Sequence, residues 1–272
     1  MKAVVFHVFQ TRPLVGSLFN AFEYFVACYE QDKDFKLVLT GAKPEDIDYY
    51  MQIFENRYDL SGLENIRNNI IDIERRIKLV QIRFENALVV DYSTIYMTKG
   101  LFCPKKLIVI SEKYTEDKDY FYRKDWYNVT YYGEMPFHYR DKEYRMKFLF
   151  DRFKKLNEVK EGIYISAPQC LDEEYLEEIN LPNKPIYFKS RDNHLNNLFE
   201  QFDTYVYYHC DRWFDPHPRL MIESYFYGKE ILYFNKPNVK DGSFYRYNDL
   251  MKRGIEDRSL TKDDEIVKEI LS

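Results

Sequence analysis

The chain has 272 residues, of which 45% are hydrophobic and 31% are charged, and its formal net charge is −5. Its length allows one large α/β domain or two domains of about 120 to 150 residues each. No apolar run approaches the roughly 20 residues of a membrane span, and the acidic balance means that any surface for nucleic acid must be local.

Strand-length apolar runs alternate with helix-period stretches along the first part of the chain. This alternation is typical of a mostly parallel sheet with helices on its faces. Within the first 112 residues we expect strands at 3–9, 35–41, 77–82, 86–93 and 105–112, and helices at 18–30, about 44–56 and 63–76.

The alternation begins again after a charged and aromatic segment at 113–126. The sequence therefore predicts two α/β halves, 1–125 and 126–272, and ligands of such sheets lie beyond the carboxyl ends of the strands. In the second half we expect strands at 128–134, 162–168, 185–189, 204–210 and 230–235, and helices at 141–156, 172–179, 193–202 and from about 216.

The last of these helices begins with "DPHPRLMIE", residues 215–223. Asp215 before a proline is typical of an N-cap, and the start of a helix attracts phosphate. Arg219 can hold phosphate oxygens, and Glu223, one turn later, can accept hydrogen bonds from the two hydroxyls of a ribose. Together these features indicate a nucleotide. The alternative is a helix cap followed by a solvated Arg219–Glu223 ion pair.

Asp215 and Glu223 are separated by seven residues, and a "YGKE" turn and an apolar strand follow them. This pattern resembles the acid-x7-acid signature of glycosyltransferases of the GT-B fold, in which two Rossmann-like domains face a cleft. The resemblance implies that Glu223 binds the ribose of the donor nucleotide and that Asp215, where the family usually has Glu, contacts a sugar hydroxyl.

A second stretch, "YYGEMPFHYRDKEYRMKFLFD" at 131–151, is similar to the corresponding part of phage DNA glucosyltransferases. The similarity implies that Arg140 and Arg145 bind the donor diphosphate, with Lys142 as a substitute. His217 lies in a donor-side loop and can also reach phosphate. By family frequency the donor is a UDP-sugar. No D-x-D metal motif lies directly after a predicted strand, and "KDD" at 262–264 is interpreted as a helix cap, so we expect no required cofactor or metal.

Asp91 ends an apolar strand, where a carboxylate can take the proton of an acceptor hydroxyl. It can equally cap the segment that follows through neighbouring N–H groups. His7 lies inside the first strand, so we expect a buried, hydrogen-bonded histidine there rather than a base. Arg12 and Gly16, in the loop after that strand, are assigned to the acceptor side.

Three functions remain open. The phage resemblance favours transfer to a hydroxymethylated base in double-stranded DNA, which needs a basic and aromatic groove. A saccharide or lipid-linked acceptor suits the acidic charge and the many aromatic residues, although no basic amphipathic helix is evident. A two-lobed nucleotide or sugar binding protein without catalysis has the same alternation.

Cysteine spacing and the first residues indicate the compartment. The cysteines form no C-x-x-C pair, so we expect reduced, buried thiols rather than a disulfide framework or a zinc site. The beginning "MKAVVFHVFQTRP" lacks the features of a signal peptide. These features favour the cytoplasm, which is the host cytoplasm if a phage encodes the chain. The cysteines are Cys28, Cys103, Cys170 and Cys210.

Overall fold

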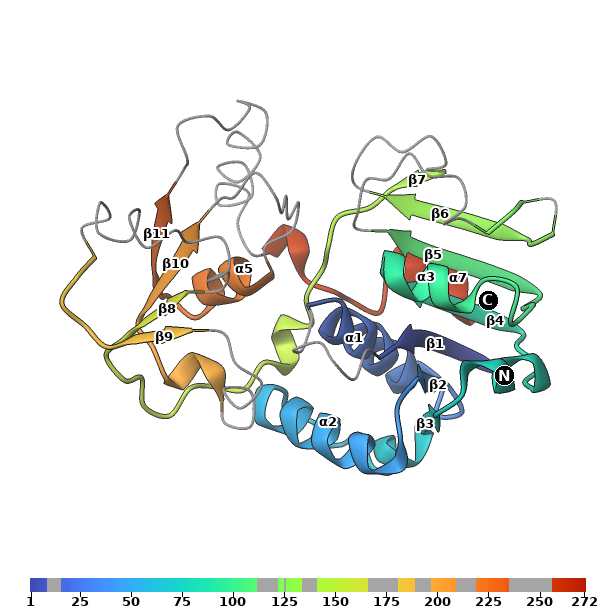
Figure 1. Cartoon of the computed structure of the whole chain (residues 1–272), viewed down its shortest axis with the longest axis horizontal. Coiled ribbons are helices and arrows are strands. Elements are labelled where there is room, and N and C mark those ends of the chain that lie inside the picture. Colours follow the sequence, from blue (N-terminus) through green and yellow to red (C-terminus); the bar gives the residue numbers. More distant parts are fainter. Residues whose placement is uncertain are drawn as a thin grey trace. The chain divides into compact units, whose positions relative to one another are not determined.

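A computed structural model describes residues 1–8, 16–111, 122–124, 126–133, 141–165, 181–188, 197–208, 219–234 and 256–272. The chain divides into two compact units (Figure 1). Unit 1 contains Met1–Phe153 and Arg258–Ser272, and unit 2 contains Lys154–Asp257. The division falls after the predicted boundary at residue 125, because strands on either side of that residue pair in one sheet.

Unit 1 is built on a seven-stranded sheet in which all neighbouring strands are parallel. The strand order is β3-β2-β1-β4-β5-β6-β7, and its first six strands follow the order 3-2-1-4-5-6 of doubly wound folds. The α/β class is therefore confirmed. The strands are β1 (Lys2–His7), β2 (Lys36–Thr40), β3 (Ile70–Ile73), β4 (Asn86–Val90), β5 (Lys106–Ser111), β6 (Val129–Gly133) and β7 (Lys142–Glu143).

Both faces of this sheet are covered, which explains why its central strands are continuous apolar runs. On one face lie α1 (Gly16–Gln31), α2 (Pro44–Arg57) and the C-terminal α7 (Glu265–Leu271). Phe22 of α1 stacks on Phe54 of α2 with ring centroids 3.7 Å apart. On the other face lie η2 (Arg76–Gln81), α3 (Tyr92–Thr98) and residues 122–124, 126 and 127.

Three predicted elements of unit 1 are wrong. The expected helix at 63–76 is a short 3₁₀ helix, η1 (Ile66–Asn69), followed by β3, and the expected strand at 77–82 is the 3₁₀ helix η2. The expected helix at 141–156 contains β7 and η4 (Phe150–Arg152). In that segment Tyr144, Met146 and Phe148 are buried at every second position, which is the period of extended backbone.

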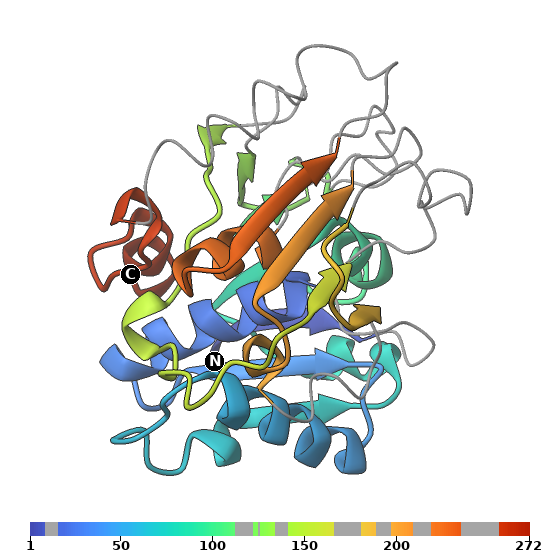
Figure 2. The same cartoon turned by 90° about the vertical axis from the view of Figure 1, so that its left-hand side faces the viewer.

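Unit 2 contains a second parallel sheet, with the order β11-β10-β8-β9 (Figure 2). Its aliphatic core is small, and it includes Ile163, Ile165 and Val206. The predicted helix at 172–179 lies outside the described residues. Within the predicted helix at 193–202, the described part is a 3₁₀ turn. The elements are β8 (Ile163–Ile165), β9 (Ile186–Phe188), η7 (Leu198–Glu200), β10 (Thr204–Tyr208), α5 (Arg219–Phe226) and β11 (Glu230–Phe234).

Candidate functional site

The carboxyl ends of the strands beside β1 and β4 form the first candidate site. In unit 1 the chain runs from β1 outward to β3 and then returns to the other side of β1 as β4. Such a reversal leaves a crevice beyond the carboxyl ends of the two central strands, where ligands of open α/β sheets bind. The residues at these ends are therefore the ones to consider.

His7 ends β1 and is held by two threonines from other elements. Its Nδ1 lies 2.9 Å from Oγ1 of Thr40, at the end of β2, and its backbone N–H donates to Oγ1 of Thr94 in α3 at 3.0 Å. Burial, and then the charge of Arg76, lower the pKa of His7 to about 4. His7 is therefore neutral at neutral pH, and the prediction of a buried, hydrogen-bonded histidine is confirmed.

The backbone after β2 passes close to His7 and Val8 at the end of β1. Gly41 follows β2 with a φ of 81°. A Cβ at this position would lie 2.7 Å from the carbonyl oxygen of Val8 and 2.9 Å from Cε1 of His7. Glycine is required here both by its left-handed backbone and by the space, so the strand ends around His7 are fixed in place.

Asp91 follows β4 directly and adopts a backbone conformation that side chains rarely take, with φ 77° and ψ 139°. Conformations of this kind cost on the order of 1–3 kcal/mol and cluster at functional sites. The backbone of Asp91 is fixed at both ends, by N–H donation to Ile110 and by acceptance from Ile95. Its side chain makes no capping hydrogen bond to the backbone of α3.

The acceptor-side pair is only partly described. Gly16 begins α1 and is exposed. Arg12 lies outside the described residues.

Unit 2 carries the second candidate site, on the helix that follows β10. Nε of Arg219 donates to Oε1 of Glu223 at 2.9 Å, and the side chains are 4% and 0% exposed. The ion pair of the alternative interpretation therefore exists, but it is buried rather than solvated. The predicted helix start, with Asp215 and His217, lies outside the described residues.

The Arg219–Glu223 pair is a candidate site because α5 lies next to a reversal in the strand order of the sheet. The chain crosses from β9, at one edge of the sheet, to β10 on the other side of β8. In open α/β sheets, ligands bind at such a reversal, beyond the carboxyl ends of the strands. At its other end, Gly228 has φ 67° and the N–H groups of Gly228 and Lys229 bond back to Tyr225 and Ser224 in a Schellman cap.

The proposed diphosphate residues belong to unit 1, whereas Arg219 and Glu223 belong to unit 2. Arg140 lies outside the described residues, and Arg145 is exposed. Lys142, in β7, contacts two carboxylates of α7, Glu265 and, at 3.0 Å, Glu269. These hydrogen bonds raise the pKa of Lys142. Lys142 thus holds the C-terminal helix to the sheet.

Sequence reasoning missed Thr40 and Thr94, the two threonines that hold His7. Their only signal was a threonine at the end of a strand and another in the turn after Asp91. It also missed Lys229, a buried lysine whose Nζ donates to the carbonyl of Phe199 at 2.6 Å, and whose pKa burial lowers to about 8. Lys229 precedes β11 and therefore lies at the amino ends of the strands. A ligand at the carboxyl ends would not reach it, so we assign Lys229 to packing.

The expectation of buried thiols is confirmed for one cysteine and wrong for another. Cys28 is buried, and burial raises the pKa of its thiol well above the ordinary value. Cys103 is exposed, because it lies in the turn before β5. Cys170 and Cys210 lie outside the described residues.

Searches against protein-family models, curated proteins and solved structures found no match to this chain. In the described ranges, no helix has both the length and the apolar character that crossing a bilayer requires. The same ranges contain no group of three or more His, Cys, Asp or Glu side chains placed to hold a metal ion.

Proposed function

We propose that the chain is a nucleotide-sugar-dependent glycosyltransferase of the GT-B type, which uses a UDP-sugar and acts on a hydroxymethylated base in DNA. The observation that carries the proposal is the buried Arg219–Glu223 pair on the helix after β10, next to the reversal in strand order of the second sheet. The doubly wound order of the first sheet supports a second ligand-binding half.

In this proposal Glu223 accepts hydrogen bonds from the ribose, and Arg219 contacts phosphate while it holds Glu223 in place. A guanidinium has five N–H donors, so one side chain can serve a carboxylate and a phosphate together. Arg145 and Arg140 bind the diphosphate in preference to Lys142, whose ammonium group already contacts Glu265 and Glu269.

The reaction requires two changes at the anomeric carbon of the sugar. The bond from this carbon to the diphosphate oxygen breaks, and guanidinium groups stabilise the negative charge that develops on the leaving group. A new bond forms to the acceptor hydroxyl oxygen, and its proton passes to Asp91. The strained backbone of Asp91 at a strand end supports this role, since such strain persists where the surrounding structure fixes a residue.

The donor site is tested by calorimetry with UDP on variants that keep the helix intact. Because Arg219→Ala would leave the buried carboxylate of Glu223 without its guanidinium, the decisive variant is Arg219→Met with Glu223→Leu, which removes both charges at once. We expect this double variant to fold and to lose UDP affinity by tenfold or more, since a charge-assisted hydrogen bond contributes about 1.5–3 kcal/mol. Unchanged affinity would leave the pair with a structural role only.

The base is tested with Asp91→Asn and Asp91→Gly, assayed for UDP release from UDP-sugars in the presence of hydroxymethylcytosine DNA. Asparagine keeps the shape but cannot take the proton, and loss of a general base costs about 100-fold or more in turnover. Glycine also removes the strain, so it should be as stable as the wild type or more so while it is equally inactive. Near-normal turnover of Asp91→Asn would assign the base to another residue.

A saccharide or lipid-linked acceptor is the second candidate. The exposed apolar side chains Ile77 and Val80, which lie among exposed Arg75 and Lys78, favour it, since such surfaces suit an acceptor held at a membrane. Transfer to an oligosaccharide, with none to modified DNA, would decide for this candidate. UDP binding without turnover on any acceptor would instead support a binding protein.

A further inference from the structure

Three short segments form a continuous layer over one face of the sheet in unit 1. They are η2, α3 and the described residues 122–124, 126 and 127, and we refer to them as the outer layer. Nη1 of Arg76 in η2 donates to the carbonyl of Met97 in α3 at 3.4 Å. The backbone N–H of Gly100, just after α3, donates to the hydroxyl of Tyr127 at 3.0 Å.

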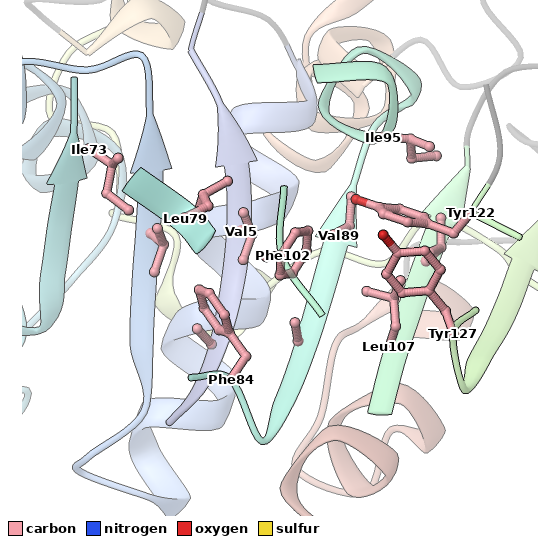
Figure 3. Close-up of a cluster of buried hydrophobic side chains, with 14 of the residues drawn as sticks. Val5, Ile73, Leu79, Phe84, Val89, Ile95, Phe102, Leu107, Tyr122 and Tyr127 are labelled. Carbon is pink, nitrogen blue, oxygen red and sulfur yellow. The ribbon is translucent and has the colours of Figure 1, made fainter. Parts of the chain in front are cut away.

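The inner side of the outer layer belongs to the core of unit 1 (Figure 3). Leu79 of η2, Ile95 of α3, and Tyr122 and Tyr127 are buried against the strands. These buried side chains are sufficient to hold each segment of the outer layer against the sheet. Any apolar side chain on the outside needs a separate explanation.

The outer side of the layer nevertheless carries large apolar and aromatic side chains. Ile77 and Val80 are each 57% exposed, Tyr96 is 51% exposed and Trp126 is 65% exposed. Side chains three residues apart in a 3₁₀ helix lie above one another, so Ile77 and Val80 form one apolar edge. Among the described residues of unit 1, these four are the large hydrophobic side chains that are exposed.

Positive charge surrounds this apolar edge. Arg75, Lys78 and Arg83 are exposed beside Ile77 and Val80. Segment 75–83 contains four Lys and Arg and no Asp or Glu, and the exposed Glu74 and Glu85 flank it. Because the whole chain has a net charge of −5, the rest of it carries −5 − 4 = −9. The apolar edge of the outer layer therefore carries a local positive charge in an otherwise acidic protein.

We infer that the outer layer docks unit 1 on an anionic lipid membrane surface. In such an interface Ile77 and Val80 enter the boundary between head groups and acyl chains, while the Arg and Lys side chains contact anionic head groups. Tyr96 and Trp126 suit the same depth, where amphipathic rings gather. A nucleic acid would match the cations but leave the aliphatic edge in water, so the membrane accounts for more of the surface. The inference does not depend on the proposed function.

The test is sedimentation of the full chain with vesicles of phosphatidylcholine alone, or of phosphatidylcholine with phosphatidylglycerol. We expect binding to the anionic vesicles that weakens as salt is raised, because the cations act through screened attraction. Each Lys or Arg near an anionic surface contributes about fivefold in partitioning, so Arg75→Gln, Lys78→Gln and Arg83→Gln together should lower binding by about 100-fold. Binding that is equal for the two kinds of vesicle would contradict the inference.

Matched variants in unit 2 separate the outer layer from general charge and apolarity. Ile77→Ser with Val80→Ser should lower binding by about tenfold, whereas Val159→Ser with Ile186→Ser, which also changes two exposed aliphatic residues, should not. The charge control is Lys154→Gln, Lys155→Gln and Lys160→Gln, all exposed. Circular dichroism checks that each variant is folded. Equal losses in both units, or binding to duplex DNA but not to vesicles, would overturn the proposal.

Discussion

Two buried carboxylates, Asp264 in unit 1 and Glu223 in unit 2, are stabilised in different ways. Asp264 is an N-cap that accepts from the N–H groups of Ile266 and Val267 and pairs with Nζ of Lys147 at 2.5 Å, so it joins α7 to another part of unit 1. Glu223 accepts from Arg219 within the same helix. That bond joins no separate elements.

The two carboxylates therefore differ in what their described contacts connect. Removing a charge from water is costly, and a buried ion pair is often no more stabilising than apolar side chains of similar volume. Asp264 repays that cost by capping a helix and fixing its position. The bond between Arg219 and Glu223 lies within one turn of α5, next to the reversal in strand order, and this position is why we assign the pair to a ligand.

The largest effect is expected from breaking the pair in unit 2. Arg219→Ala leaves the carboxylate of Glu223 buried without its guanidinium, and such a change costs about 3–5 kcal/mol. Amide hydrogen exchange reports the two units separately, so protection should fall in β10 and β11 while β1 and β4 keep theirs. Equal loss of protection in both sheets would show that the pair also supports unit 1.

The double variant Arg219→Met with Glu223→Leu is the control for this prediction. If the pair stabilises nothing beyond its own turn, exchange in β10 should return to within about 1 kcal/mol of the wild type. A double variant as unstable as Arg219→Ala would make the pair structural, like Asp264, and would remove the reason for assigning it to a ligand.

Sequence patterns predicted most of the strands because each is an apolar run with clear turn signals at its ends. They failed at 63–82, where Ile and Leu are frequent, and at 141–156, where Phe is the most frequent apolar residue, because the elements in both stretches are short. In η2 only Leu79 is fully buried while Ile77 and Val80 face outward, so the apolar residues there do not report the core. Sequence alone cannot distinguish a buried isoleucine from an exposed one, because both positions carry the same residue type.

The candidate sites were predictable to a smaller extent. The Arg219–Glu223 contact follows from the spacing of four residues on a helix, and the N-cap role of Asp264 follows from the run of polar residues before α7. The burial of the Arg219–Glu223 pair depends on the elements that cover it, so spacing could not reveal it. The contacts of His7 join three segments that are far apart in the sequence, and no local pattern announces them.

His7 provides an intermediate effect, because its burial in unit 1 keeps the imidazole neutral at neutral pH. Its folded pKa of about 4 lies below the ordinary value of 6.5, so between these values the unfolded chain binds a proton that the folded chain does not. Stability therefore falls as the pH drops from 6.5 to 4, by up to about 3 kcal/mol. Urea unfolding at pH 7 and pH 4.5 measures it. His7→Gln should lose less stability than the wild type over this interval, and an equal loss would contradict the assignment.

The smallest effect is expected for Asp264, and it tests the structural role of the buried carboxylate in unit 1. Asp264→Ala removes an N-cap, which costs about 1 kcal/mol, and the partner of Lys147, so we expect a loss of about 2 kcal/mol confined to unit 1. The matched control is the neighbouring Asp263→Ala, whose carboxylate is 69% exposed and pairs with Lys268 at 3.2 Å. Exposed pairs contribute about 0–1 kcal/mol, so this control should change little. Hydrogen exchange in α7 distinguishes the two variants. If both carboxylates mattered equally, burial would not be what gives Asp264 its role, and the contrast with Glu223 would lose its physical basis.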